Sequence, residues 1–210
     1  ANHSGRYSNP DNKPAPIIAY RHPELEQYRA ADNSCIVTDD YLKALEEKFG
    51  EAALLAREAG FDAVDIKSCH GYLLAELTSA FTRSGAYGGS YENRTRLLKN
   101  AIRAAKVYET DDFMVTSRLG IYDGHAWPYG FGVSEGFGLT PDLAEPVRLV
   151  RELHDELGLS MVDLTMGNPY ATTHVTRPFD AGKYQPDEHP FTGLARMIHG
   201  IGTVKQAVPE

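Results

Sequence analysis

The feature that most constrains the fold is an amphipathic helix that is followed at once by a short apolar strand. Apolar residues fall three or four positions apart over 42–56, Thr38 is a candidate N-cap, and Gly60 closes the run. The apolar segment 63–66 follows directly and is bounded by polar residues, as expected of a strand. A helix that leads straight into a strand predicts an α/β fold.

The same unit of helix and strand recurs along the chain. Because Pro146 lies early in the third helical pattern, which opens near Thr140, we expect that helix to start late. Three such units and a fourth helix are too few for a closed barrel, so the sequence predicts a fragment of a larger α/β domain. The further helices are predicted over about 97–108, 140–157 and 192–206, and the further strands over about 113–118 and 161–164.

Long loops follow the predicted strands and do not precede them. They cover 68–89, 120–139 and 167–191, whereas the proline-rich residues 1–37 predict an extended loop segment. In barrels of alternating strands and helices, the loops after the strands build the active site. We therefore expect the catalytic residues at strand ends within the helix and strand repeats of 38–210.

Composition and charge disfavour several classes of protein. The 210 residues include 21 Lys and Arg against 29 Asp and Glu, and the net charge of −8 disfavours nucleic acid and anionic membranes as partners. No apolar stretch approaches the roughly 20 residues that a membrane-spanning helix needs. Two cysteines, Cys35 and Cys69, are too few for a disulfide framework or a four-cysteine metal site. We expect a soluble, cytoplasmic protein and predict no metal site.

The segment after the first strand carries a lysine, a thiol, an imidazole and a phenol. Lys67 and His70 lie three positions apart, so they can face one cavity if the chain turns helical after the strand. A neutral imidazole beside a cation can hydrogen-bond a carbonyl or oxyanion, and the Tyr72 hydroxyl can deliver a proton to a developing carbanion. The alternative from spacing alone is that His70 bonds a backbone carbonyl and Tyr72 belongs to the core.

Several strings occur in order along the chain. They are His3-Ser4-Gly5-Arg6, Ala59-Gly60-Phe61-Asp62-Ala63-Val64-Asp65-Ile66, His70-Gly71-Tyr72-Leu73-Leu74, Arg83, Tyr87-Gly88-Gly89-Ser90-Tyr91-Glu92-Asn93-Arg94-Thr95-Arg96 and Arg118. Together they resemble the old yellow enzyme family of FMN-dependent oxidoreductases, although the resemblance is weak over 9–36 and after Asn168. It implies a partial TIM (β/α)8 barrel with roughly strands four to six and flanking helices. Residues 1–210 would then form the central portion of a single FMN-binding domain.

The resemblance also implies an activity and roles for individual residues. FMN would be reduced by NADH or NADPH and reoxidised by a small electron-poor acceptor such as an activated alkene. Tyr72 matches the family's proton donor, and His70 matches the second of two residues that grip the acceptor's activating group. Arg118 matches the arginine beside the flavin, where a guanidinium stabilises negative charge on reduction. The alternative for Arg118 is a salt bridge at the strand end.

Lys67 departs from the family pattern, because many members carry a histidine as the first gripping residue. An ammonium can donate to a carbonyl, nitro or carboxylate oxygen, but its reach and charge differ from those of an imidazole. A lysine at a barrel strand end also allows a Schiff-base aldolase. That alternative leaves the motif over 87–96 unexplained.

Other motifs have both a structural and a functional interpretation. The turn and helix start over 87–96 is interpreted as architectural, with Ser90 as a cap and Arg94 and Arg96 bound to carboxylates or carbonyls, while a phosphate cradle is the alternative. Glycines and aromatic residues over 119–139 suit a substrate-covering loop or a packed surface loop equally. Polar residues after the third predicted strand that could reach the same cavity or a pyridine-nucleotide phosphate are Asn168, Tyr170, His174 and Arg177.

A fragment of a barrel has exposed sheet edges. Such edges invite pairing with another chain, so we expect the isolated chain to form a homo-oligomer and to bind FMN poorly. The alternative function for the isolated chain is a catalytically incomplete, self-associating module without flavin. Retention of flavin on purification separates the two.

Overall fold

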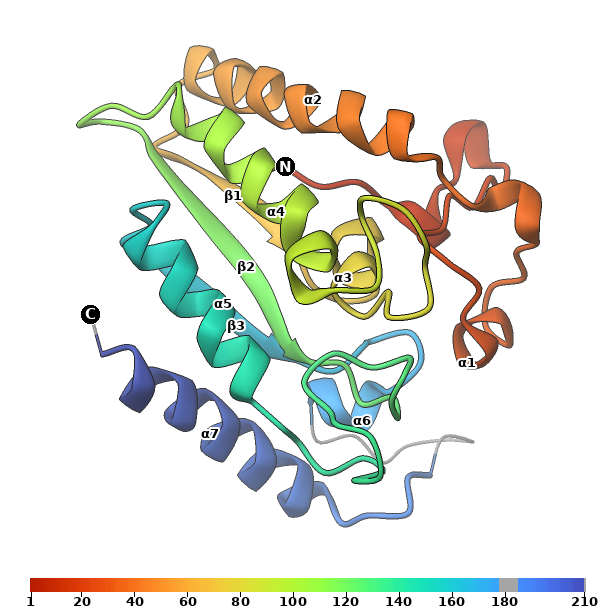
Figure 1. Cartoon of the computed structure of the whole chain (residues 1–210). Coiled ribbons are helices and arrows are strands. Elements are labelled where there is room, and N and C mark those ends of the chain that lie inside the picture. Colours follow the sequence, from red (N-terminus) through yellow and green to blue (C-terminus); the bar gives the residue numbers. More distant parts are fainter. Residues whose placement is uncertain (178–184, 210) are drawn as a thin grey trace.

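A parallel three-stranded sheet organises the chain in the computed structural model, which describes residues 1–177 and 185–209 (Figure 1). Its strands are β1 (Ala63–Ser68), β2 (Met114–Tyr122) and β3 (Val162–Met166), and they pair in that order. Helices connect the successive strands, as parallel pairing requires. The predicted α/β class is confirmed, and the arrangement is that of a partial barrel.

The four long helices of the described ranges lie where the sequence pattern predicts, and the predicted caps Thr38 and Ser90 are present. The Thr38 hydroxyl accepts a hydrogen bond from Tyr41 N at 3.1 Å, and Ser90 accepts one from Asn93 N at 3.3 Å. The third long helix begins late, as predicted, with Pro146 in its first turn, where a missing N–H breaks no intrahelical bond. The α-helices are α1 (Pro23–Glu26), α2 (Asp39–Glu58), α3 (Leu73–Thr78), α4 (Tyr91–Lys106), α5 (Ala144–Asp155), α6 (Thr173–Thr176) and α7 (Pro190–Ala207).

Strand β2 and helix α3 differ from the sequence prediction, and the short helices α1 and α6 were not predicted either. Strand β2 continues to Tyr122, beyond the predicted end near Arg118, because Gly120 still pairs with Thr165 of β3. The glycine had been assigned to the following loop. Helix α3 was not predicted, because all of its residues are buried and it therefore lacks an amphipathic pattern.

The segment over 1–37 is partly buried. It contains 3-10 turns η1 (Gly5–Tyr7), η2 (Pro10–Asn12) and η3 (Asn33–Cys35), and its Ile18 exchanges backbone hydrogen bonds with Cys35 and Val37 at 2.9 Å. The Ile18 side chain is fully buried. Residues 9–15 stay exposed, so only part of this mostly irregular segment packs into the core.

The first residues of the chain lie beside β1. Lys67 N donates to Ala1 O at 3.0 Å, and Leu73 N donates to His3 O at 3.3 Å. These bonds cover the edge of β1 that faces away from β2.

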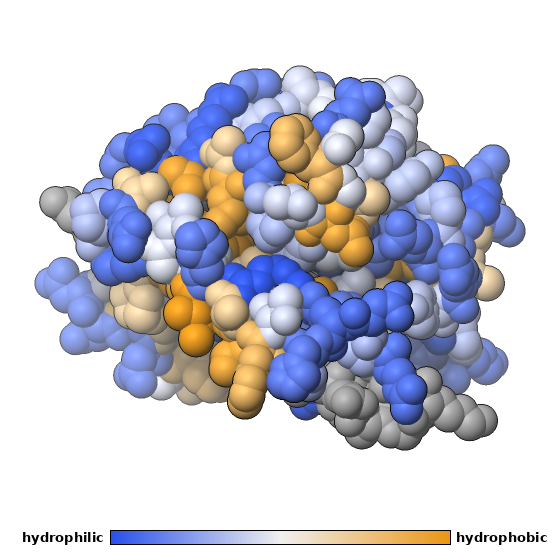
Figure 2. Space-filling view, turned by 90° about the horizontal axis from the view of Figure 1, so that it is seen from below, coloured by the Kyte–Doolittle hydropathy of each residue, from blue (hydrophilic) through white to orange (hydrophobic). Residues whose placement is uncertain are grey.

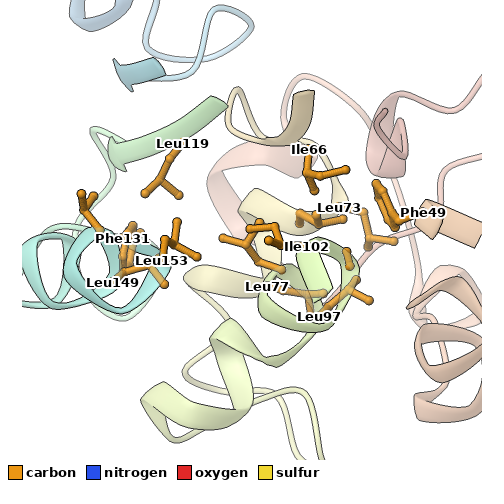
Figure 3. Packing of buried hydrophobic residues seen from close by; sticks show 14 of the residues in the cluster. Phe49, Ile66, Leu73, Leu77, Leu97, Ile102, Leu119, Phe131, Leu149 and Leu153 are labelled. Carbon is orange, nitrogen blue, oxygen red and sulfur yellow. The ribbon is translucent and has the colours of Figure 1, made fainter. Parts of the chain in front are cut away.

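The core lies between the sheet and the helices (Figure 3). Ile66 of β1 packs with α3 and α4 through Leu73, Leu97 and Ile102, and all four side chains are buried. A second group joins Leu119 of β2 to Phe131 and to the buried face of α5 (Figure 3), and its α5 members are Leu149 and Leu153. Burial of this apolar area fixes the sheet relative to its helices.

Apolar side chains also reach the surface along α7, which lies at the lower edge of Figure 1. Phe191, Leu194 and Ile198 are exposed on that helix, and Figure 2 shows apolar patches beside a hydrophilic strip on this side of the molecule. Patches of this kind commonly mark packing surfaces. Within the described residues, no helix has the length and apolar character needed to cross a membrane.

Candidate active site

A row of charged side chains crosses the three strands on one face of the sheet, and only its β1 member lies near the carboxyl end of its strand. Lys67 of β1 is in register with Arg118 of β2, and Arg118 is in register with Asp163 of β3. Residues in register on neighbouring parallel strands point to the same face of a sheet. The sequence could place each residue at a strand end, but only the pairing register brings them into one row.

This row lies on the face of the sheet that the helices do not cover. Val64, Ile66 and Ser68 of β1 are buried, whereas the alternating residues Asp65 and Lys67 are half-buried. Because successive side chains of a strand point to opposite faces, Lys67 points away from the helical layer. In a barrel this face is the interior, and the carboxyl ends of its strands form the active-site mouth.

A tight turn after β1 carries the next two candidate residues. His70 and Gly71 have φ values of +63° and +68°, so the chain turns left-handed there and helix α3 begins only at Leu73. The helical turn that the sequence analysis required after β1 is therefore absent. A Cβ at Gly71 would overlap the Asn168 amide, so this position requires glycine both for its φ and for its contact with the loop after β3.

Tyr72 follows this turn and contacts Lys67 of β1 and Tyr170 of the loop after β3. The Lys67 Nζ atom lies 3.5 Å from the centroid of the Tyr72 ring, a cation–π contact. The Tyr72 hydroxyl lies 3.4 Å from the hydroxyl of Tyr170, which comes from the loop after β3. The structure thus brings Lys67, Tyr72 and Tyr170 together, and it does not place Tyr72 in the core.

The sequence analysis missed Tyr7, which completes the aromatic wall of the site. Its ring stacks on that of Tyr170 with centroids 4.0 Å apart. Tyr7 follows Arg6, whose buried side chain pairs with Glu76 of α3 at 2.6 Å. The motif His3-Ser4-Gly5-Arg6 could have pointed to Tyr7, because it is part of the family resemblance and directly precedes this residue.

The His70 imidazole is neutral at neutral pH. Burial, together with the positive charges of Lys67 and Arg118, lowers its pKa to about 4. No hydrogen bond from residues in the described ranges reaches this ring, so it does not bond a backbone carbonyl of those residues, as the alternative expected. A neutral imidazole keeps one donor and one acceptor for a ligand.

Arg118 is half-exposed and forms the ion pair that the alternative interpretation expected. Its Nε lies 2.9 Å from Asp163 Oδ2, but no well-aligned hydrogen bond within the described chain reaches this enclosed nitrogen. The guanidinium therefore retains donors for a further acceptor. A planar cation with free donors on the inner face of the sheet fits the electron-rich edge of a reduced flavin.

The motif over 87–96 is held within the protein. Arg94 donates to Gly89 O at 3.0 Å and pairs with Glu145 at 2.7 Å, and Arg96 donates to Ala86 O at 2.8 Å. Both guanidinium groups thus bind carbonyls or carboxylates of the chain. These contacts agree with the architectural interpretation and not with a phosphate cradle.

The segment over 119–139 divides into a buried part and an exposed part. Phe131 is fully buried and Tyr122 belongs to β2, so part of the segment packs into the core. Trp127 and Phe137 are exposed. Only the exposed part is available as a cover over a ligand.

The remaining candidates divide between the site and its surroundings. Asn168 is buried under the turn at Gly71, and Tyr170 reaches Tyr72. His174 instead lies 3.5 Å from Glu188, and Arg177 ends the described part of this loop. Burial raises the pKa of the Cys69 thiol to about 11, so this residue is an unreactive neighbour of the site.

Comparison with known proteins identifies sequences that share these features. A sequence model of the NADH:flavin oxidoreductase / NADH oxidase family matches residues 2–174. An NADPH dehydrogenase of Clostridium acetobutylicum is 30% identical over 163 residues, which cover 76% of this chain and 44% of that protein. A cinnamate reductase of Clostridium sporogenes is 39% identical over 88 residues, which cover 40% of this chain and 13% of that protein. The chain thus spans less than half the length of these relatives.

A solved structure shares the arrangement of the elements. The complex of 2-naphthoyl-CoA reductase with 2-naphthoyl-CoA superposes with a TM-score of 0.68 at 20% identity and covers 98% of this chain and 30% of the other. At this identity the likeness concerns the fold alone. It agrees with a partial barrel in which the three strands are neighbours.

Proposed function

Because this chain belongs to the NADH:flavin oxidoreductase / NADH oxidase family, we propose that the protein that contains it reduces an activated alkene with electrons from NADH or NADPH, carried by FMN. We also propose that residues 1–210 form the central part of a single FMN-binding barrel domain. The similarity to a cinnamate reductase of Clostridium sporogenes supports this class of acceptor. The contact of Lys67 with Tyr72 beside His70 and Arg118 carries the proposal for the site.

Bound FMN would supply hydride to the β carbon of the acceptor and would recover it from NAD(P)H. Tyr72 would donate its hydroxyl proton to the α carbon, so that one hydride and one proton saturate the double bond. The resulting tyrosinate would regain a proton from solvent through Tyr170, whose hydroxyl lies 3.4 Å away and whose side chain is 45% exposed.

The other side chains of the site would hold the acceptor and the flavin. His70 and Lys67 present donors from the same strand end, so they can hydrogen-bond an oxygen of the activating group. Withdrawal of electron density by these donors would stabilise the charge that develops on that oxygen. Arg118 would donate to the flavin edge that becomes negative on reduction.

The two alternatives from the sequence make different predictions. A Schiff-base aldolase would use Lys67 as a nucleophile and would be trapped by borohydride with a carbonyl substrate. Family membership supports the oxidoreductase. A self-associating module without flavin describes the isolated chain only if that chain fails to retain FMN through gel filtration.

We test the proposed function in the full-length protein with the two half-reactions separated. Under anaerobic conditions, NADPH should bleach the flavin absorbance and 2-cyclohexenone should restore it. Tyr72→Phe should slow the restoration by about 100-fold or more, while the bleaching rate should stay unchanged. Tyr108→Phe is the matched control, because Tyr108 lies beyond the end of α4 and far from the strand ends. Equal losses in both half-reactions would refute the assignment of Tyr72 as proton donor.

A further inference from the structure

We propose that Lys67 makes this site selective for acceptors whose activating group carries a negative charge, such as a carboxylate. The inference rests on the proposed function, because it names the class of acceptor for the same site. Its basis is the pairing of charges on this face of the sheet. The relevant residues are Lys67, Arg118 and the two carboxylates of the face, Asp65 and Asp163.

The positive charge of Lys67 has no carboxylate to balance it. Arg118 is paired with Asp163 at 2.9 Å, whereas no carboxylate of the described residues lies within 4.0 Å of Lys67 Nζ. His70 adds no charge, because its imidazole is neutral at neutral pH. Lys67 therefore presents an ammonium without an ion-pair partner where the acceptor would bind. The carboxylates of the same face contact Arg118 instead: Asp163 forms the ion pair, and Asp65 Oδ1 accepts from Arg118 N at 3.2 Å.

The position of this charge matches the position of the proton donor. The ammonium rests on the face of the Tyr72 ring, with Nζ 3.5 Å from the ring centroid. An acceptor that presents its α carbon to the Tyr72 hydroxyl therefore brings its activating group within reach of Lys67. For a carboxylate this contact is a charge-assisted hydrogen bond, which is stronger than the bond to a neutral carbonyl.

A neutral imidazole at the same place would not discriminate in this way. It offers one N–H donor to a carbonyl and to a carboxylate alike. The ammonium adds an attraction that only the anion receives, and its three donors can satisfy both carboxylate oxygens. Replacement of histidine by lysine thus changes the preferred charge of the ligand while it preserves hydrogen bonding.

Equilibrium binding of benzoate and benzamide tests this inference, since the two probes have the same shape and differ in charge. Calorimetric titration of the full-length, FMN-loaded protein should show benzoate bound about tenfold more tightly than benzamide at low salt. Lys67→Met should remove this preference, and Lys67→Arg should retain it. Lys48→Met is the matched control, because Lys48 is an exposed lysine of α2 that pairs with Glu51, and it should leave both affinities unchanged.

The outcomes separate this inference from the proposed function. If Lys67→Met weakens the binding of benzoate and benzamide equally, Lys67 only positions Tyr72. If the variant keeps its preference for benzoate, another group supplies the positive charge that attracts the anion. Either result overturns the inference. If the protein reduces 2-cyclohexenone and shows no benzoate preference, the inference fails and the proposed function stands. If Lys67 selects benzoate but no alkene is reduced, the anion site stands and the proposed reaction fails.

Discussion

Replacing Arg6 with methionine would leave the Glu76 carboxylate without its cationic partner inside the protein. Arg6 Nε lies 2.6 Å from Glu76 Oε1, and the two side chains are 0% and 1% exposed. The second Glu76 oxygen accepts from Ala19 N at 2.9 Å, so the carboxylate also ties the 1–37 segment to α3. The ion pair is therefore the buried link that holds the segment with Tyr7 against the site.

The cost of this replacement follows from the burial of the pair. A buried charge that loses its partner cannot recover its hydration, and such losses destabilise proteins by about 3–5 kcal/mol. A typical domain has a free energy of unfolding of only about 5–15 kcal/mol. The Arg6→Met variant should thus lose a large fraction of its stability.

Urea unfolding followed by circular dichroism measures this effect in a cycle of variants. Glu76→Gln should cost about as much as Arg6→Met, because it leaves the guanidinium buried and unpaired. The double variant should be more stable than either single variant, since glutamine still accepts the Ala19 N–H and no charge remains buried. Lys48→Met supplies the surface control: its pair with Glu51 is mostly exposed and should contribute less than about 1 kcal/mol.

The reasoning would be refuted if Arg6→Met cost no more than Lys48→Met, or if the double variant were the least stable of the set. Limited proteolysis gives a second measurement. Because Arg6 anchors the segment, Arg6→Met should speed cleavage within 1–37 before the rest of the chain is cut. Cleavage that begins in the helices would contradict the assigned role of the pair.

Two further predictions concern other positions. Burial raises the pKa of Asp123 from 3.8 to about 6, so its stabilising protonated form is lost as the pH rises from about 4 to 6. Asp123→Asn can still accept from Phe131 N, so in urea titrations it should raise the unfolding free energy by about 1–2 kcal/mol at pH 7 and not at pH 4. The expected gain is moderate because the Asp123 side chain is only half-buried. A gain that is the same at both pH values would contradict this. Gly71→Ala should destabilise the chain by about 1–3 kcal/mol in thermal unfolding, and by more than the control Gly136→Ala. Both positions have positive φ, but only a Cβ at Gly71 meets the Asn168 side chain. Equal losses of stability in the two variants would show that backbone strain alone is responsible.

Local patterns in the sequence were sufficient to predict those helices and strands whose apolar spacing and caps involve residues close together in the chain. The helix caps at Thr38 and Ser90, the late start of α5 after Thr140 and the three strands were all predicted from spacing, because each depends on neighbours within a few residues. Short α3 escaped prediction because its burial on all sides removes periodicity. Strand β2 was cut short because Gly120 is a loop signal that strand pairing overrode.

The sequence alone also named Lys67, His70, Tyr72 and Arg118 as candidate site residues and linked them to a flavin family. The tertiary structure decided how they meet. Strand register aligned Lys67 with Arg118, a left-handed turn delivered Tyr72 to Lys67, and the buried Arg6 pair brought Tyr7 to the wall of the site. These relations join residues far apart in the chain, and their geometry is set by sheet pairing and burial, which no local pattern of residues contains.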